Sequence, residues 1–442
     1  MLTRRVIAVF DIGKTNKKFF LFDEDYHILY ETSSHLPETH DEDGDPCEDL
    51  QALTNWIQDT FNEYNLNPEF QIRWINFSTY GASFVHHGND GLPCAPLYNY
   101  LKPFPENLKA LFYGRYGGPA AFAKTTASPV LGSLNSGMIL YLLRHRKPAT
   151  FARIRHSLHL PQYVSYLFTS SLCSDLTSIG CHTNLWDFER KSYHRWVSDE
   201  GVDKKLAPIF RSNQVIEIPG VHGIMYSGIG LHDSSSALIP YLLNVTEPFI
   251  LLSTGTWCIS MNPFNDDPLT TDELDQDCLC YFSYEGKPVK ASRLFSGHFH
   301  EENCVRLSAH FNVTDDAYKT AEILDEDLPD FDPADLSRFN SFREGYNSLI
   351  RHLVKRQVVA IDLVFKPQIK TVFVDGGFSQ NQIFMTLLAE AYPDLKVYAA
   401  SVVQASALGA ALAVHSHWDR SETRKHLLNL KEVKGRRAKG DV

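Results

Sequence analysis

Residues 6–22 read VIAVFDIGKTNKKFFLF, and residues 248–261 read PFILLSTGTWCISM. In both stretches an apolar run ends in a short polar turn that contains glycine, and a second apolar run follows that turn. Apolar runs of this length, bounded by turn-forming residues, are typical of two strands joined in a hairpin. The repeat of this unit near the start and past the middle of the chain predicts a duplicated domain. A third strand is expected after the first hairpin, before residue 35.

Segments with helical spacing alternate with further apolar runs along both halves of the chain. Leu50, Leu53, Ile57 and Phe61 fall on one face of a helix that we expect over residues 47–66. The other expected elements are helices over 136–145, 341–365, a segment ending near 392 and 405–414, and strands over 371–374 and 397–399. Alternation of strands and helices indicates an α/β fold.

The boundary between the two halves is expected near residues 240–248, where Pro240 and Pro248 flank a short segment. This divides the chain into a first domain of residues 1–244 and a second domain of residues 245–442. Two domains also fit the length of 442 residues, which exceeds what one hydrophobic core usually organises.

The composition excludes several classes of protein. A formal net charge of −11 argues against a nucleic-acid binder, because phosphate neutralisation needs a basic face. The exception is a C-terminal basic cluster, which is typical of a solvated, partly disordered tail: Lys431, Lys434, Arg436, Arg437 and Lys439. No apolar segment has the length of a membrane span, and the run after Arg5 is too short for a signal peptide. Eight scattered cysteines favour a reducing, cytoplasmic setting.

The two hairpin turns carry residues that suit phosphate. In the first turn, Asp11 ends the strand, Gly13 allows close approach, and Thr15 and Asn16 add side-chain donors. The second turn, Ser253–Thr256, offers hydroxyl and amide groups without a carboxylate. Two such turns facing each other would hold a polyphosphate from both sides. Either turn alone is also explained by conformation, because tight turns need glycine, asparagine and threonine.

Asp233 lies in the stretch GIGLHDSSSAL, residues 228–238, where glycines precede the start of a predicted helix. One interpretation is an ordinary helix N-cap, which contributes about 1 kcal/mol. The other is a catalytic base, because the positive end of a helix keeps a carboxylate ionised. Phosphoryl transfer needs little more from the protein than such a carboxylate, correct positioning and charge neutralisation.

A further glycine pair, Gly376 and Gly377, follows the predicted buried strand at 371–374 and precedes Asn381. Glycines at this place suit a flat adenine or a ribose packed against the backbone. They are equally expected in a tight strand-to-helix turn.

These four elements, in this order and spacing, resemble the FGGY carbohydrate kinase family of the actin/hexokinase/Hsp70 superfamily, over roughly residues 5–415. The resemblance implies two ribonuclease-H-like (actin-like ATPase) domains around a central cleft, with the sugar on the first domain and ATP with Mg²⁺ mainly on the second. It implies a phosphotransferase that moves the γ-phosphoryl group of ATP onto a small sugar.

The resemblance also assigns roles to particular residues. Asp233 is implied to be the base, and Asp11 is implied to serve the magnesium shell. Nucleotide contacts are implied for Asp11, Gly13, Lys14, Thr15, Asn16, Lys18, Thr254, Gly255, Thr256, Gly376, Gly377 and Asn381. The run Ser406–Ala411 resembles the closing helix near the interdomain hinge. The chain departs from the family pattern at Lys14, where many members have threonine, and at Gln404, where many have glutamate.

Sugar contacts are expected from the first domain, because sugars need hydrogen-bonding groups and an apolar or aromatic wall. The candidates are Tyr80, Ser83, Tyr98, Asn99, Asp175, His232 and Asp233, each of which could also be an ordinary surface or core polar group. The stretch that begins with His232 and Asp233 and continues with small polar residues resembles the corresponding stretch of rhamnulose and fuculose kinases. A ketose is therefore favoured, pentuloses stay open, and so does the choice between a monomer and a homodimer.

Several rival interpretations are weighed against a kinase. A catalytically silent sensor of sugar or nucleotide with the same fold is the main alternative, and the retained Asp11 and Asp233 argue against it. A chaperone-like or filament-forming ATPase lacks support from the motifs. The histidines and acidic residues of 298–304 fit no standard zinc spacing, and Asp41, Asp43 and Asp45 do not complete a calcium loop. No Walker A or dinucleotide-binding glycine motif occurs.

Overall fold

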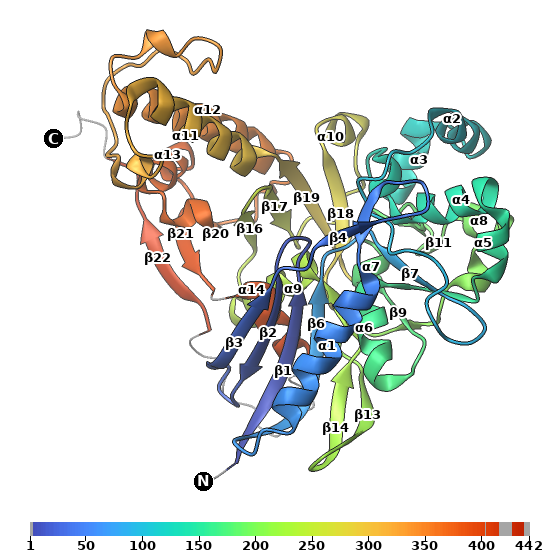
Figure 1. Ribbon diagram of the computed structural model, residues 1–442. Helices are drawn as coiled ribbons and strands as arrows, with labels where there is room; N and C mark the ends of the chain where they lie inside the picture. The colour runs from blue at the N-terminus through green and yellow to red at the C-terminus, as the bar shows by residue number, and fades with distance from the viewer. Residues whose placement is uncertain (1–2, 403, 415–426, 437–442) are drawn as a thin grey trace.

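The computed structural model describes residues 3–402, 404–414 and 427–436. Two large sheets dominate these residues (Figure 1). The first sheet has the order β13-β14-β6-β1-β2-β3, with β15 paired to β6, and the second has the order β18-β19-β17-β16-β20-β21-β22. All strands of the first large sheet precede residue 233, and all strands of the second follow residue 248.

The strands of the first sheet are β1 (Arg4–Ile12), β2 (Lys17–Phe22), β3 (Ile28–Ser34), β6 (Phe70–Thr79), β13 (Val215–Gly220), β14 (Gly223–Gly228) and β15 (Leu231–His232). Those of the second are β16 (Phe249–Thr254), β17 (Cys258–Asn262), β18 (Cys278–Phe282), β19 (Pro288–Leu294), β20 (Thr371–Gly376), β21 (Lys396–Ser401) and β22 (Asn429–Val433). Short paired strands are β4 (Glu38–His40) with β5 (Pro46–Glu48), β7 (Phe84–His87) with β8 (His156–His159), β9 (Ser174–Asp175) with β12 (Ile209–Phe210), and β10 (Trp186–Asp187) with β11 (Ser192–Tyr193).

The helices are α1 (Leu50–Asn65), α2 (Glu106–Arg115), α3 (Pro119–Thr126), α4 (Ser136–Arg146), α5 (Pro148–Arg153), α6 (Leu160–Thr169), α7 (Leu176–Ile179), α8 (Arg195–Asp199), α9 (Asp233–Asn244), α10 (Thr271–Asp275), α11 (Ser296–Phe311), α12 (Phe342–Asp362), α13 (Gln382–Ala391) and α14 (Ala405–Ala413). Single 3₁₀ turns lie at Gly132–Leu134, Asp203–Lys205, Ala317–Thr320, Leu336–Arg338 and Gly377–Gln380. The elements predicted from the sequence are all present, with ends shifted by a few residues.

The predicted duplication is visible in the strand order. In the first sheet, β1 runs antiparallel to β2 and parallel to β6. In the second sheet, β16 runs antiparallel to β17 and parallel to β20. The sets β3-β2-β1-β6 and β19-β17-β16-β20 therefore repeat one arrangement. Each half builds its sheet outward from one of the two hairpins recognised in the sequence.

The two sheets are joined by a shared apolar layer. Strand β1 alternates its side chains, so that Phe10 packs on the α1 side of the sheet and Val9 packs on the other side with α9 and α14. Apolar side chains of α9 and α14 share one buried cluster with the inner faces of both sheets. These two helices lie between the sheets in Figure 1.

The crossing of α9 and α14 depends on a glycine. A Cβ atom placed on Gly409 would lie 1.8 Å from the carbonyl oxygen of Ser236 on α9. Asn76 of β6 also donates a hydrogen bond of 2.7 Å to the carbonyl oxygen of Ala410. The backbones of the two helices therefore approach too closely for any side chain at position 409.

The expected boundary at 240–248 needs a correction, because Pro240 lies inside α9 and the connection between the halves is shortened to residues 245–248. A proline inside a helix leaves the carbonyl four residues earlier without its hydrogen bond. That carbonyl belongs to Ser236, the same group that faces Gly409 of α14. The close crossing of the two helices accommodates the freed carbonyl, so the proline is tolerated.

The basic C-terminal segment is also more ordered than expected. Lys431 lies in β22, which pairs antiparallel with β21. Arg436 forms ion pairs with Glu390, at 2.6 Å, and with Asp325. The positions of Arg437 and Lys439 lie outside the described residues. Among the basic residues that the structure describes, Lys431 therefore belongs to a sheet and Arg436 is ion-paired, while other side chains are solvated.

Candidate active site

Three neighbouring strands of the first sheet end side by side. Strand pairing places Ile12 of β1 opposite Thr79 of β6, and Thr79 opposite His232 of β15. All three strands run parallel, so their carboxyl ends meet at one edge of the sheet. Ligands bind at this edge in open α/β sheets. The pairing brings Asp11 and Asp233, which are 222 positions apart in the sequence, to the same edge.

Asp11 is a half-buried carboxylate whose partner comes from the far end of the chain. Its Oδ2 accepts a hydrogen bond of 2.7 Å from the hydroxyl of Ser406, in the first turn of α14. Burial raises the pKa of Asp11 to about 6, and the negative charge of Asp233 adds to that rise. The two carboxylates therefore lie close enough to interact electrostatically.

Asp233 is the first residue of α9, and its N-cap is His232, which corrects the expectation that Asp233 is the cap itself. Its Oδ1 accepts a hydrogen bond of 2.6 Å from the N–H of Ser234 and lies 3.2 Å from Nε2 of His232. The Asp233 side chain is 36% exposed, whereas that of His232 is buried. The carboxylate is held at the positive end of a helix and remains accessible to a substrate.

The surroundings of Asp11 fit a magnesium ion. Its carboxylate, the carboxylate of Asp233 and the hydroxyl of Ser406 are all oxygen donors, which Mg²⁺ prefers. A partly buried carboxylate with a raised pKa is costly to ionise alone, and a nearby divalent cation would offset that cost. Among the described residues, Asp11 is therefore well placed to serve the magnesium shell.

The lysines of the first hairpin are held by carboxylates. The N–H of Gly13 closes the turn by donating to the carbonyl of Asn16 at 2.9 Å. Lys17, which is buried, pairs with Glu48 at 2.5 Å. Lys18 lies 3.4 Å from Glu31. Among the described residues, the tip of the first hairpin is therefore a closed turn whose lysines are paired with carboxylates.

Lys14 is grouped with the sugar candidates. Its ammonium group lies 2.6 Å from Glu38 and 3.5 Å from Glu48. The same Glu48 accepts a hydrogen bond of 3.1 Å from the hydroxyl of Tyr80, and the amide of Asn99 donates to Glu38 at 3.4 Å. This network brings Lys14, Tyr80 and Asn99 together beside the strand end that leads to the first hairpin. It favours a sugar-side position for Lys14.

The other sugar candidates are distributed more widely. The Tyr98 hydroxyl donates to Glu42 at 2.6 Å, in a network that also includes Lys147. Ser83 is buried just after Tyr80. Asp175 caps α7, where its Oδ1 accepts the N–H of Ser178 at 3.0 Å, and its two carboxylate oxygens also accept the hydroxyls of Thr177 and Ser212. Because both carboxylate oxygens of Asp175 already have partners, a structural role is favoured over a sugar contact.

The second hairpin presents hydroxyl groups and backbone. The hydroxyl of Thr254 donates to the carbonyl of Asp375 at 2.6 Å and accepts the N–H of Phe378 at 3.0 Å. Gly376 has φ +89°, and a Cβ on it would lie 1.9 Å from the carbonyl oxygen of Thr254. A Cβ on Gly377 would meet no atom within 4 Å. The two segments predicted to bind the nucleotide, 253–256 and 376–377, therefore contact each other, and the space beside Gly377 is open.

The turn of the second hairpin also packs against a helix N-terminus. A Cβ on Gly297, in the first turn of α11, would lie 1.8 Å from the carbonyl oxygen of Gly255. The carbonyl of Thr256 accepts the N–H of His298 at 3.2 Å. These contacts fix Gly255 and Thr256 at the amino end of a 16-residue helix, where anionic groups bind favourably.

The Asn381 side chain is committed within the protein. Its Oδ1 caps α13 by accepting the N–H of Phe384 at 3.0 Å, and its amide donates to the Tyr346 hydroxyl at 2.7 Å. The adenosine contact implied by the sequence resemblance stays a prediction for this residue.

Sequence reasoning missed residues that the fold brings to the site. Tyr100 is half-buried; burial raises its pKa, and the charge of Asp233 adds to the rise. Glu48 holds both Lys14 and Lys17. The position of Ser406 was recognised only as part of a closing helix. A signal for Tyr100 was available, because it directly follows the candidates Tyr98 and Asn99.

The discounted metal patterns have structural explanations. His300 lies 3.1 Å from the Tyr346 hydroxyl and 3.4 Å from the sulfur of Cys304, within the packing between α11 and α12. Asp41, Asp43 and Asp45 converge on the ammonium group of Lys102. A lysine thus occupies the centre of the acidic loop that resembled the start of a calcium site.

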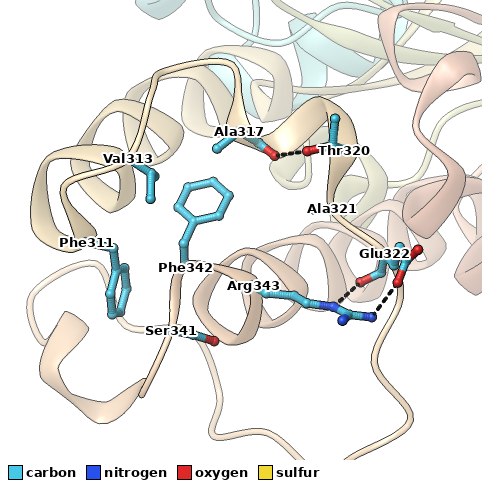
Figure 2. A pocket seen from close by; sticks show the side chains of 9 residues that line it. All are labelled: Phe311, Val313, Ala317, Thr320, Ala321, Glu322, Ser341, Phe342 and Arg343. Carbon is cyan, nitrogen blue, oxygen red and sulfur yellow. Dashed lines mark hydrogen bonds and ion pairs between the residues drawn. The ribbon is translucent and has the colours of Figure 1, made fainter.

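A pocket of about 480 Å³ lies at the outer tip of the second sheet's helical layer (Figure 2). Its walls include Phe311 at the end of α11 and Phe342 at the start of α12, and Arg343 pairs with Glu322 at its rim. Since α11 has 16 residues, the pocket is roughly 24 Å along the helix from the hairpin end. It contains none of the predicted site residues.

Comparison with protein families identifies the second half of the chain. Residues 246–332 match the model described as carbohydrate kinase FGGY, C-terminal domain. Residues 340–416 match the model described as FGGY family of carbohydrate kinases, C-terminal domain. No curated protein sequence matches the chain.

Solved structures share the fold over nearly the whole chain. A carbohydrate kinase from Novosphingobium aromaticivorans has a TM-score of 0.77 at 23% identity, covering 98% of this chain and 95% of that one. A ligand-bound xylulose kinase from Lactobacillus acidophilus has a TM-score of 0.80 at 16% identity, covering 98% and 94%. A gluconate kinase from the same organism has a TM-score of 0.77 at 14% identity, covering 98% and 94%. At these identities the likeness establishes the fold, which is the expected two-domain, actin-like α/β fold.

The expected enzyme class is confirmed by the two family matches: the chain is a carbohydrate kinase, a phosphotransferase for which ATP and Mg²⁺ are the expected cofactors. The inclination towards rhamnulose and fuculose kinases has no counterpart among these matches. No helix in the described ranges combines the length and apolar character needed to cross a bilayer.

Proposed function

We propose that the enzyme phosphorylates a hydroxyl group of a small ketose and that Asp233 is the general base. The observation that carries this proposal is the meeting of Asp11 and Asp233 at the ends of three parallel strands. Asp233 is exposed enough to reach a substrate, and Asp11 is half-buried near it with oxygen donors around it.

In the proposed reaction, the Asp233 carboxylate accepts the proton of the sugar hydroxyl as that oxygen attacks the γ-phosphorus. The new oxygen–phosphorus bond forms while the bond from the γ-phosphorus to the bridging oxygen of ADP breaks. ADP leaves with the electron pair of that bond. Positioning and charge neutralisation supply most of the catalysis in such transfers. Mg²⁺, when bound at Asp11, would neutralise phosphate charge.

We assign the sugar and the base to residues 1–244, and ATP mainly to residues 245–442. The network of Lys14, Glu48, Tyr80 and Asn99 supports the first assignment, since it lies beside the Asp11 strand end. The joined turns at Gly255 and Gly376, set against the amino end of α11, support the second assignment. Closure of the two domains over the substrates would exclude water and protect ATP from hydrolysis.

The substrate is proposed from chemistry and resemblance together. The pair His232–Asp233 supports a rhamnulose- or fuculose-like ketose, while pentuloses and sugar acids are the natural competitors. We place the enzyme in the cytoplasm, where its eight unpaired cysteines would stay reduced. The choice between monomer and homodimer is left to a measurement of mass in solution.

The test is coupled ADP release from ATP and Mg²⁺ with L-rhamnulose, L-fuculose, D-xylulose, D-gluconate and glycerol in separate reactions. We expect one ketose to give a kcat/KM at least tenfold above the others, with no ADP formed when sugar is omitted. A sugar that binds in calorimetry without ADP formation would favour a silent sensor instead. Preference for gluconate or glycerol would refute the ketose assignment and leave the kinase class intact.

A further inference from the structure

Arg293 is a buried cation of the second domain that the proposed mechanism does not yet use. It lies on β19, and its side chain is only 7% exposed. Its Nη2 donates to Oδ1 of Asp277 at 2.7 Å, whereas its Nε–H has no hydrogen-bond partner among the described residues. A buried donor without a partner is costly, so this group is a candidate for contact with a ligand.

One side of the guanidinium faces the second hairpin. Strand β19 pairs with β17, which places Arg293 opposite Ile259, three residues beyond Thr256. The guanidinium carbon lies 5.3 Å from the centroid of the Trp257 ring, and Trp257 directly follows Thr256. The cation therefore lies beside the turn to which we assign the phosphates of ATP.

The positive charge of Arg293 also acts on the first domain, near the segment that carries Asp233. Burial lowers the pKa of His182 to about 3, and the positive charge of Arg293 adds to that lowering. The neighbouring Cys181 sulfur lies 3.0 Å from Nε2 of His232, which precedes Asp233. Arg293 thus acts electrostatically on residues of the first domain that touch the catalytic segment. Its guanidinium therefore lies beside the second hairpin and within electrostatic range of first-domain residues that border His232.

We propose that Arg293 is a catalytic residue that binds the phosphoryl group as it passes from ATP to the sugar, an inference that rests on the proposed function. During transfer, charge is spread over the three equatorial oxygens of that group. A guanidinium offers planar, paired donors that match those oxygens. The pair with Asp277 fixes the guanidinium in advance, so that little reorganisation is needed during the reaction.

The neighbouring Lys290 provides a matched control. It lies on the same strand, is also buried, and pairs with Glu273 at 2.6 Å. Because Lys290 and Arg293 are three positions apart on a strand, their side chains point to opposite faces. Lys290 therefore shares the burial and ion pairing of Arg293. Its side chain lies on the opposite face of the sheet, away from the position that Arg293 occupies beside the second hairpin.

The experiment compares Arg293→Met, Arg293→Lys and Lys290→Met with the wild type. We expect kcat of Arg293→Met to fall about 10³-fold, as for removal of a catalytic arginine, with partial recovery in Arg293→Lys. The Kd for Mg²⁺-ADP should change less than about twofold, whereas the tightening of ADP binding by fluoroaluminate, which mimics the transferring group, should be lost. Lys290→Met should keep kcat within about threefold of the wild type.

Three outcomes would overturn the proposal. The first is a kcat for Arg293→Met within about tenfold of the wild type. The second is an effect of Arg293→Met that is confined to the KM for sugar. The third is a loss of kcat in the folded Lys290→Met variant equal to that in Arg293→Met. The fluoroaluminate arm needs ADP and Mg²⁺ and no sugar. A wild type that is inactive on every sugar, yet binds ADP more tightly with fluoroaluminate in an Arg293-dependent way, would contradict the sugar assignment and support the role of Arg293.

Discussion

The two sheets of this enzyme share a strand arrangement and differ in the chemistry at their ends. In the first sheet, β1 and β15 lead to the carboxylates Asp11 and Asp233. In the second, β16 and β20 lead to the hydroxyl of Thr254 and to Gly376, whose backbone approaches that of Thr254. One scaffold thus carries two carboxylates in one copy and neutral donors with backbone space in the other.

This difference suggests how a duplicated domain divides a reaction. A carboxylate beside the triphosphate would repel it, so the second sheet benefits from neutral hydroxyl and amide groups. The proposed proton acceptor is a carboxylate, and in the proposal it lies near the sugar on the first sheet. Tyr241 reinforces the division, because its hydroxyl donates at 2.9 Å to Asp375, the carboxylate that does lie at the end of β20.

The largest expected effect comes from removing the proton acceptor. Asp233→Asn should lower kcat by about 10³-fold, within the roughly 10²–10⁴ range of general-base catalysis. Its KM for ATP should stay within about threefold, because the nucleotide is assigned to the other sheet. Steady-state kinetics with the preferred sugar would measure both quantities.

The matching change in the second sheet is Thr254→Val, which removes the hydroxyl that bridges Asp375 and Phe378. In Thr254→Val the KM for ATP should rise about tenfold. The kcat of this variant should fall less than the kcat of Asp233→Asn. The proposed division would be contradicted if Asp233→Asn raised mainly the KM for ATP, or if Thr254→Val raised mainly the KM for sugar.

The link between the two regions can be tested at the helix crossing. Gly409→Ala should destabilise the protein by about 3 kcal/mol, because its Cβ would lie 1.8 Å from the carbonyl of Ser236 and force the helices apart. Gly114→Ala on α2 is the control, since its Cβ would meet no atom within 4 Å and alanine favours a helix. Thermal unfolding should separate the two variants clearly, and equal melting temperatures would refute the close crossing.

Acid should weaken the first domain through its buried histidines. Burial lowers the pKa of His86 to about 3, below its ordinary value of 6.5, and the charge of His87 adds to the lowering. The folded state therefore excludes a proton that the unfolded state accepts, so stability is lost as the pH falls below 6.5. At 1.36 kcal/mol per pH unit, His86 contributes about 2 kcal/mol to the loss between pH 6.5 and 5.

His86→Asn should therefore make the fall in unfolding free energy with acidification about 2 kcal/mol shallower over this interval. His27→Asn removes an imidazole that is 76% exposed and serves as the control. Denaturant unfolding at pH 5, 6 and 7 would provide the comparison. Identical pH dependence in the wild type and His86→Asn would show that His86 is protonated without cost in the folded protein.

Much of the fold could be predicted because its signals are local. The hairpins at 6–22 and 248–261, the helices and the glycine turns are each encoded within a short window of sequence. Pro240 misled the boundary prediction because its tolerance depends on Gly409, which is 169 positions away. A proline rule applied locally cannot anticipate a helix crossing that accommodates a freed carbonyl.

The side-chain partners at the site were less predictable for the same reason. Ser406 reaches Asp11 across 395 positions of sequence, and no local pattern links the two. Asp175 looked like a sugar contact until the fold placed hydroxyl groups around both of its oxygens. Arg293 gave no signal, because a charged residue on a strand is usually solvent-facing, and its burial beside Asp277 and Trp257 appears only in the fold.

The central claim, that the two sheets divide the substrates, can be tested by hydrogen–deuterium exchange with Mg²⁺-ADP alone. We expect ADP to slow exchange most at residues 253–257, 297–298 and 376–381, while residues 79–83 and 231–234 change little. Addition of the preferred sugar should then protect the latter segments. Strong ADP protection at 79–83 and 231–234, with residues 253–257 unaffected, would contradict the division.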